Sequence, residues 1–483
     1  MAEVPARTVQ EYIDETPLWK DGTTLLKSPM TSMQWRIWGL ATAGKFFEGM
    51  VVFMTGVALP LLVLEFQIGT AEKGLVGAAT LFGILVGATA LGGLADRFGR
   101  KAMFIGEMAL FTVFLVAVSF SPSFPVMVVC LFGMGLALGC DYPTAHLVIS
   151  ESIPSGDRGR LVLGAFAFQA VGALVGTLIG FMILKSSEEV WDWRMMYGVA
   201  IVPAVLVTIG RFFVTQSAHW LMEQGRVEEA ERETARLLRR EPPYPRVVKL
   251  KKAREEEQHD KSPGFAKLFK KKHRRATILA SVPWFLQDLG TYGIGIFTPT
   301  ILAATIGQVS QNERNLAEVI HNDMKAAEGA AFIDVLLVVG IVLAVLLVER
   351  VGRIRLQIVG FIGCAVGLLI AAFSTYCTGM MQVVLIFAGF MLFNLMTNLG
   401  PNAMTYLLAG EVFPTKIRGV GAGFAASFAK IGAVLTAFLF PVFLNELGTA
   451  LLLYILAGTS LLGALITWRF AIETRGNLEK LEH

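Results

Sequence analysis

Charged residues are scarce in this sequence: Asp, Glu, Lys and Arg make up 17% of its 483 residues, against about 25% in soluble proteins. The mean hydropathy is high, at +0.60, which excludes a disordered chain and an ordinary soluble enzyme. The four cysteines stand singly in apolar runs, without a Cys-x-x-Cys pair, so neither a disulfide framework nor a metal site is expected. No nucleophile–base pair stands at a useful spacing, and we expect no enzymatic activity and no cofactor.

Long apolar runs alternate with short polar breaks from Ile37 onward. A helix needs about 20 apolar residues to cross a bilayer, and twelve runs come close to that length. They fall into six, a long break, and six more: 37–65, 74–95, 102–120, 124–149, 161–184, 195–214, 276–304, 329–348, 355–376, 380–408, 419–445 and 449–470. The sequence therefore predicts an all-α membrane protein with twelve transmembrane helices in two six-helix bundles.

The distribution of Lys and Arg predicts how the chain is oriented. The breaks after the second, fourth, eighth and tenth spans are rich in these residues, and the alternate breaks are poor in them. Cytoplasmic loops carry such an excess, so we expect this face and both termini to be cytoplasmic, in a plasma or inner membrane. The first 35 residues contain no apolar core of a signal peptide, so we expect no cleaved leader.

The expected organisation has five parts. A cytoplasmic segment precedes the first bundle, a cytoplasmic loop separates the two bundles, and a tail follows the second. Their residues are 1–36, 37–214, 215–275, 276–470 and 471–483. The loop holds 17 of the 42 Lys and Arg residues and suits short amphipathic helices on an anionic lipid surface. A regulatory or nucleic-acid role for this loop is the alternative, and we predict no nucleic-acid partner.

Two motifs occur once in each half and indicate that the halves are copies. An acidic-Arg-x-Gly-Arg motif recurs after 253 residues, and a Glu-x-x-Pro-x-x-x-Arg-Gly motif recurs after 260. The first pair contains Asp96, Arg97, Gly99 and Arg100, and Glu349, Arg350, Gly352 and Arg353; the second contains Glu151 and Arg158, and Glu411 and Arg418. Charge-assisted hydrogen bonds around a glycine turn can latch helix ends, so we predict a gating role. Plain topology charges explain the arginines but not the fixed acidic and glycine positions.

The segment Gly92–Lys101 resembles the signature loop of the major facilitator superfamily. The second motif pair and the closing Glu473–Gly476 resemble the sugar-porter and organic-ion branches of that superfamily. The resemblance implies a monomeric transporter that works by alternating access, with its substrate site between the halves. Residues 215–221 depart from the proline- and arginine-containing version found in sugar porters, which makes a hexose substrate less expected.

Ionisable side chains at membrane depth are functional candidates, because each costs about 2.5–3.5 kcal/mol to insert. Lys45 and Glu48 share one face of the first span, although a self-neutralising structural pair is the alternative. Trp284, Asp288 and Tyr292 stack along one face of the seventh span. Two further residues are set aside. His146 is expected to be a buried, hydrogen-bonded histidine, and Asp334 is expected near the membrane interface.

These polar residues resemble one branch in particular, the phosphate/proton symporters. The segments concerned are Gly139–Pro143, Phe168-Gln169, Trp284–Gly293 and Asn398–Asn402, with Lys430. The resemblance implies two groups of site residues: Tyr142, Gln169, Trp284, Asp288, Tyr292, Asn398, Asn402 and Lys430 for the substrate, and Glu48, Asp141 and Asp288 for protons. The first span departs from the family pattern, which has two aspartates there, whereas this chain has Glu48 and an added lysine.

The charges themselves favour an anionic substrate. Two lysines and three carboxylates form the expected buried set, which is repulsive to an anion unless a carboxylate takes up a proton. Anion binding and protonation then favour each other, so that the small-molecule substrate and protons move together. We therefore predict proton-coupled symport of a small anion such as inorganic phosphate. An organic-ion or sugar transporter, and a non-transporting membrane receptor or scaffold, are the alternatives.

Overall fold

The computed structural model describes residues 6–16, 28–91, 94–156, 158–187, 189–239, 247–251, 265–310, 316–414 and 417–472. Several predicted features lie outside these residues: Gly92 of the signature loop, the Glu473–Gly476 motif and much of the basic loop. The described residues form helices, apart from connections and one isolated β-bridge between Arg7 and Leu250.

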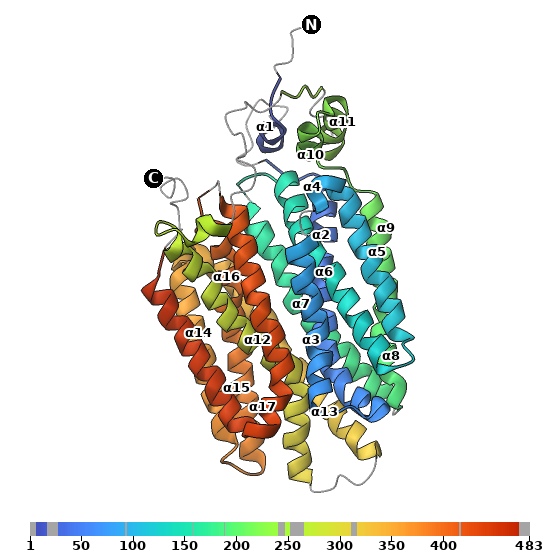
Figure 1. Ribbon diagram of the computed structural model, residues 1–483, viewed down its shortest axis with the longest axis vertical. Helices are drawn as coiled ribbons and strands as arrows, with labels where there is room; N and C mark the ends of the chain where they lie inside the picture. Colours follow the sequence, from blue (N-terminus) through green and yellow to red (C-terminus); the bar gives the residue numbers. More distant parts are fainter. Residues whose placement is uncertain are drawn as a thin grey trace.

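The first half forms one bundle, drawn from blue to green in Figure 1. Its membrane-spanning helices are α2 (Ser32–Phe66), α3 (Thr70–Val86) with the π-helical turn η1 (Gly87–Leu91), α5 (Arg100–Ser119), α6 (Phe124–Ser152), α7 (Arg158–Ser186), and α8 (Trp193–Val199) joined to α9 (Ile201–Phe212). The short helix α4 (Leu94–Phe98) carries the first part of the acidic-Arg-x-Gly-Arg motif.

The second half forms a bundle beside the first (Figure 1). Its helices are α12 (Arg274–Ser310), α13 (Leu316–Val351), α14 (Arg353–Ser374), α15 (Met380–Leu399), α16 (Pro401–Glu411) and α17 (Arg418–Arg469). Within the described residues, ten helical segments are long and apolar enough to cross a membrane. One of them, α17, has 52 residues and is broken at Gly448, where φ is +76°. Counting its two arms separately and adding the 37-residue α12 gives twelve spans, so the predicted all-α fold is confirmed.

The eighth span differs from its prediction in one consequential way. Helix α13 begins at Leu316, well before the predicted start at residue 329. Asp334 therefore lies in the middle of this helix and is buried, with 4% of its surface exposed. The hydropathy pattern did not show that the polar turns before residue 329 belong to the same helix. The expectation that Asp334 lies near the membrane interface stays a prediction.

Both repeated motifs lie at one end of the bundles, which we call the motif end. Three small helices, α1 (Val9–Asp14), α10 (Ala218–Glu223) and α11 (Val227–Leu237), also lie there (Figure 1). They pack onto the first bundle: Asp14 accepts a hydrogen bond from the backbone N–H of Ser155 at 2.7 Å, and Thr31 donates one to the carbonyl of Leu237 at 2.7 Å. These amphipathic segments therefore bury their apolar sides against the protein.

Helix backbones from the two halves approach each other closely toward the end opposite the motifs. A Cβ added to Gly74 of α3 would collide with the carbonyl oxygen of Phe438 on α17, and one added to Gly56 of α2 would collide with that of Ile296 on α12. Small residues allow such close approach of helix backbones in a membrane. This end of the molecule is consequently closed by backbone-to-backbone packing between the two halves.

Candidate functional site

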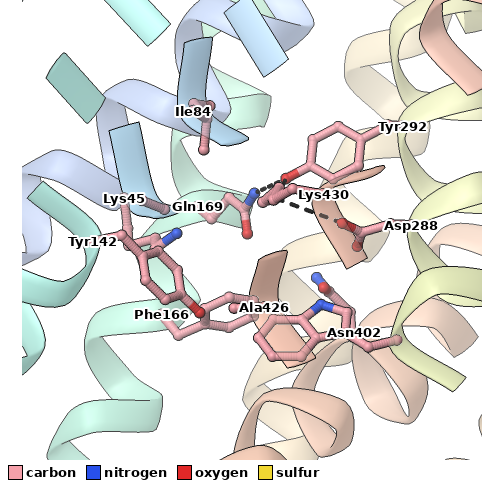
Figure 2. A pocket seen from close by; sticks show the side chains of 12 residues that line it. Lys45, Ile84, Tyr142, Phe166, Gln169, Asp288, Tyr292, Asn402, Ala426 and Lys430 are labelled. Atoms are coloured by element: carbon pink, nitrogen blue, oxygen red, sulfur yellow. Dashed lines mark hydrogen bonds and ion pairs between the residues drawn. The ribbon is translucent and has the colours of Figure 1, made fainter. Parts of the chain in front are cut away.

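A small cavity lies between the two halves, with a volume of about 20 Å³, the size of one water molecule. Figure 2 shows side chains from both halves pointing into it. They are Lys45, Ile84, Ala88, Tyr142, Phe166, Gln169, Trp284, Asp288, Tyr292, Asn402, Ala426 and Lys430. The helical spacing of α12 places Trp284, Asp288 and Tyr292 on the same side, as the sequence predicts. A larger substrate therefore requires this space to open.

Glu48 of α2 connects the two halves at this cavity. One carboxylate oxygen, Oε2, pairs with Nζ of Lys45 at 2.5 Å, and the other, Oε1, pairs with Nζ of Lys430 at 3.3 Å. Oε1 also accepts hydrogen bonds from the Tyr292 hydroxyl at 3.0 Å and the Gln169 amide at 3.3 Å. With 3% of its surface exposed, Glu48 is held by two cations, one from each half.

Lys430 of α17 lies between two carboxylates. Its Nζ donates to the Tyr292 hydroxyl at 2.5 Å and lies 3.6 Å from Oδ2 of Asp288. That hydroxyl also accepts from the Gln169 amide at 2.9 Å, the contact marked in Figure 2. Two lysines and two carboxylates thus face each other, and their formal charges cancel when all four are ionised. An added anion makes this group net negative.

Two polar groups at the cavity have unused hydrogen-bonding capacity. Among the residues that the structure describes, the Tyr142 hydroxyl and Oδ2 of Asp288 are buried without a hydrogen-bond partner. The ring of Tyr142 is occupied, because Nζ of Lys45 lies 3.7 Å from its centroid, a cation–π distance. Buried polar atoms normally have partners, so these two are the ones that a ligand can satisfy.

An aromatic cluster closes the cavity toward the motif end. Tyr406 of α16 stacks on Phe166 of α7 with ring centroids 4.5 Å apart, and meets Tyr142 and Trp284 edge-on at 6.1 Å. Beyond it lies a second cavity of about 20 Å³, which Asp141 and His146 help to line. This thin cluster contrasts with the backbone packing at the opposite end, so the site is separated from the motif end mainly by side chains. Sequence reasoning did not select Tyr406.

His146 is not the buried histidine that we expected. Its side chain is exposed, and Nδ1 lies 3.5 Å from the Tyr406 hydroxyl. The expected hydrogen bond is present, but the expected burial is wrong because α6 turns this face toward the gap between the halves, which periodicity alone does not show.

Asp141 has a different partner from the other candidate residues. Its Oδ1 pairs at 2.5 Å with Nη1 of Arg211 on α9, a side chain with no exposed surface. Arg211 also donates to the carbonyls of Phe104 at 2.6 Å and Leu40 at 3.2 Å. Of the cavities described here, Asp141 lines the second and not the central one. Its proton role stays a prediction. Arg211 was missed because its place near a span end is typical of an interfacial arginine.

Asn398 does not line either cavity around the site. Its amide nitrogen donates to the carbonyl of Leu337 at 2.9 Å, and its oxygen accepts from Asn402 at 2.7 Å. Asn398 thus ties α15 to α13 and orients Asn402, which does line the first cavity. Of the two asparagines that the resemblance implies, the structure brings only Asn402 to this space.

The two acidic-Arg-x-Gly-Arg motifs fold alike. Arg100 pairs with Asp96 at 2.7 Å and Glu151 at 3.2 Å, while in the second half the corresponding arginine pairs with two glutamates. These are Arg353 with Glu349 at 2.9 Å and with Glu411 at 3.2 Å. Gly99 and Gly352 both have φ of +95°, a conformation that favours glycine. Each arginine therefore joins both motifs of its own half.

Three other motif arginines make contacts outside these ion pairs. Arg158 donates to Gln10 of α1 at 3.1 Å, and Arg418 donates to the carbonyl of Phe413 at 3.2 Å. The guanidinium of Arg97 lies 5.5 Å from the centroid of the Phe98 ring. Whether these contacts gate the molecule stays a prediction.

Residues 215–221, which depart from the sugar-porter pattern, clamp the motifs of the first half. Ser217 donates to Glu151 at 2.5 Å, Gln216 accepts from the backbone N–H of Lys101 at 3.0 Å, and the Trp220 indole donates to the carbonyl of Asp96 at 2.8 Å. Burial lowers the pKa of His219 in the same segment. These contacts give residues 215–221 a structural role beside the turn. In the sequence, this segment served only as an argument about the substrate.

Two helical bundles around a charged, enclosed site define a secondary transporter of the major facilitator superfamily. Residues 40–482 match the model of the family described as "sugar (and other) transporter", and the chain belongs to that family. It is 29% identical to the putative metabolite transport protein YaaU of Escherichia coli, covering 91% of this chain and 92% of that protein. It is 27% identical to a putative inorganic phosphate transporter of Schizosaccharomyces pombe, covering 92% and 87%.

The fold also resembles that of a solved transporter structure. A partially occluded, inward-open structure of the xylose transporter XylE from E. coli superposes with a TM-score of 0.73, covering 92% of this chain and 99% of that one at 20% identity. The protein is therefore an integral, multi-pass membrane protein with the twelve-helix fold of this superfamily.

Proposed function

We propose that this protein is a proton-coupled symporter of a small anion, with inorganic phosphate as the first candidate. The observation that carries the proposal is the position of Glu48 between Lys45 and Lys430. An ionised Glu48 occupies both cations. A substrate anion can take them only when that carboxylate is protonated, because two anions at one pair of lysines repel each other. Anion and proton therefore bind together, which is the coupling that symport requires.

Asp288 has a complementary role in this proposal. Its Oδ2 lies 3.6 Å from Nζ of Lys430 and has no hydrogen-bond partner within the described part of the chain. Dihydrogen phosphate carries hydroxyl groups that can donate to such an oxygen, while Lys430 and the free Tyr142 hydroxyl donate to its other oxygens. The similarity to a putative phosphate transporter supports this choice.

The two unequal closures support alternating access as the mechanism. Backbone packing seals the end opposite the motifs, whereas the Tyr406 cluster separates the site from the motif end. By the positive-inside rule we place the motif end and both termini in the cytoplasm. Rocking of the halves would then open the opposite end to the outside and expose Glu48 there.

The test is uptake of labelled phosphate into proteoliposomes, with and without an inward proton gradient. We expect accumulation that a protonophore abolishes. Asp288→Asn should remove accumulation while the protein remains folded, because the variant loses the carboxylate oxygen that we propose to accept from a phosphate hydroxyl. Glu328→Gln is the matched control, since this glutamate is exposed on α13 and lies outside the cavity. Normal accumulation by Asp288→Asn would overturn the assignment of this residue.

An organic anion is the second candidate, and the aromatic lining favours it. Tyr142, Phe166 and Trp284 present ring surfaces to the cavity, which suit the apolar body of a carboxylate better than phosphate. Competition for uptake by carboxylates, monosaccharides and amines separates these classes. A receptor or scaffold on the same fold would bind a ligand without any flux.

A further inference from the structure

Asp334 is a buried carboxyl that the symport mechanism does not use. It lies in the middle of α13, away from the residues that line the central cavity. Oδ2 is 2.7 Å from Oγ1 of Thr177 on α7, in the first half, and Oδ1 accepts from the Asn394 amide on α15 at 3.1 Å. Asp334 therefore links the two halves by a single hydrogen bond.

No basic side chain balances Asp334 within the part of the chain that the structure describes. Helix α15 contains no ionisable residue, and α7 contains no charged residue between Arg160 and Lys185. On α2 and α12, the ionisable groups near the site, Lys45, Glu48, Asp288 and Tyr292, bond to one another or to Lys430. On α14 the charged residues are Arg353 and Arg355, at the motif end; on α13 itself they are Glu318, Asp323, Lys325, Glu328, Glu349 and Arg350, with His321, toward the two ends.

The hydrogen bonds around Asp334 suit a neutral acid. The Thr177 hydroxyl has one hydrogen and lies 3.0 Å from the carbonyl of Ala173. When the Thr177 hydroxyl donates that hydrogen to the Ala173 carbonyl, its oxygen can accept a hydrogen bond from a protonated Oδ2 of Asp334, 2.7 Å away. Every polar group is then satisfied without a buried charge. A carboxylate here would have two neutral donors and no cation among the described residues, which is costly for a buried side chain.

We propose that Asp334 is a proton-binding site, separate from the central site, whose protonation permits the end opposite the motifs to close. Thr177 and Asp334 come from different halves, so separation of the halves at this end breaks their contact and hydrates the carboxyl. An ionised Asp334 then favours the open, hydrated arrangement. Binding of one proton removes the charge and favours the closed arrangement seen here, by differential affinity of the proton for the two states.

The experiment measures closure directly and needs no substrate. Spin labels go on Ser186→Cys at the end of α7 and Lys325→Cys near the start of α13, two exposed positions at that end. Cys377→Ser removes the one native cysteine that is not buried. Distances between the labels are recorded by double electron–electron resonance in lipid nanodiscs from about pH 5 to about pH 9. We expect the ratio of closed to open molecules to fall with rising pH, by up to about tenfold per unit.

Two variants and two controls decide the proposal. Asp334→Asn keeps the shape without the charge, so it should stay closed at every pH. Thr177→Val should lower the closed-to-open ratio about fivefold at low pH, as expected for one hydrogen bond. Glu328→Gln, on the exposed side of α13, should keep the wild-type pH dependence. Glu65→Gln, at a glutamate that pairs with Arg194 outside the central cavity, should keep it too.

A pH-dependent distance change that persists in Asp334→Asn would overturn the proposal, as would a wild-type distance that does not respond to pH. If Asp334→Asn does not fold, an unchanged ratio in Thr177→Val would overturn it.

Discussion

Replacing Glu48 with Gln removes the charge that holds two lysines while nearly preserving the size of the side chain. In the wild type, phosphate must bind together with one proton, so its apparent dissociation constant should rise up to tenfold for each pH unit. One unit corresponds to about 1.36 kcal/mol, and two units to about 2.7 kcal/mol. In Glu48→Gln, the contacts of 2.5 Å to Lys45 and 3.3 Å to Lys430 no longer join ions, and this pH dependence should disappear.

The direction of the pH dependence depends on which form of Glu48 competes with the substrate for the lysines. The ionised carboxylate holds the lysines, so affinity in the wild type falls as the pH rises, and the variant should bind more tightly than the wild type at about pH 8. Isothermal titration calorimetry measures this, with concentrations counted as dihydrogen phosphate because phosphate itself changes charge in this range. Glu65→Gln is the control on the same helix, since Glu65 pairs with Arg194 at 2.7 Å outside the cavity. An unchanged slope in Glu48→Gln would refute the coupling role.

Three further predictions concern the scaffold. Arg211→Gln strands the buried Asp141 and should cost about 3–5 kcal/mol of stability, seen as a lower melting temperature that Asp141→Asn partly restores in the double variant. Gly74→Ala should prevent closure against Phe438 and reduce uptake at least about tenfold, whereas Gly39→Ala, which meets open space, should have no effect on uptake; equal uptake would refute the closure described here. Ser217→Ala loses a hydrogen bond to Glu151 and should lower stability by about 1.5–3 kcal/mol, measured by chemical denaturation; an unchanged midpoint would remove the proposed clamp.

The fold was accessible from the sequence because two independent signals agree. Apolar runs set the number of spans, and the repeated motifs identify the halves as copies. Helical spacing also predicts that Trp284, Asp288 and Tyr292 share a face, since neighbours four apart lie on one side of a helix. The resemblance to phosphate symporters assigned Tyr142, Gln169 and Lys430 to the substrate, and the structure brings them to the same cavity.

What the sequence could not provide was the pairing between helices. Arg211 and Asp141 are 70 residues apart, and nothing local distinguishes a buried arginine near a span end from one that reaches the membrane surface. The start of the eighth helix was misplaced because hydropathy locates the apolar part of a helix and not its full length. Asn398 and Asn402 are four residues apart and would share one face of an unbroken helix. The break at Gly400 lets only Asn402 reach the cavity.

The central claim is that one proton and one anion cross together, and the most direct measurement follows both in the same vesicles. A pH-sensitive dye inside proteoliposomes reports proton entry while labelled phosphate reports anion entry, without an imposed proton gradient. Both sides are kept at about pH 5, below the second ionisation of phosphate, so that dihydrogen phosphate itself releases no proton in the lumen. We predict that external phosphate acidifies the lumen of wild-type vesicles at a rate that matches its uptake, and that Glu48→Gln abolishes the acidification. Anion entry without acidification by the wild-type protein would contradict the claim.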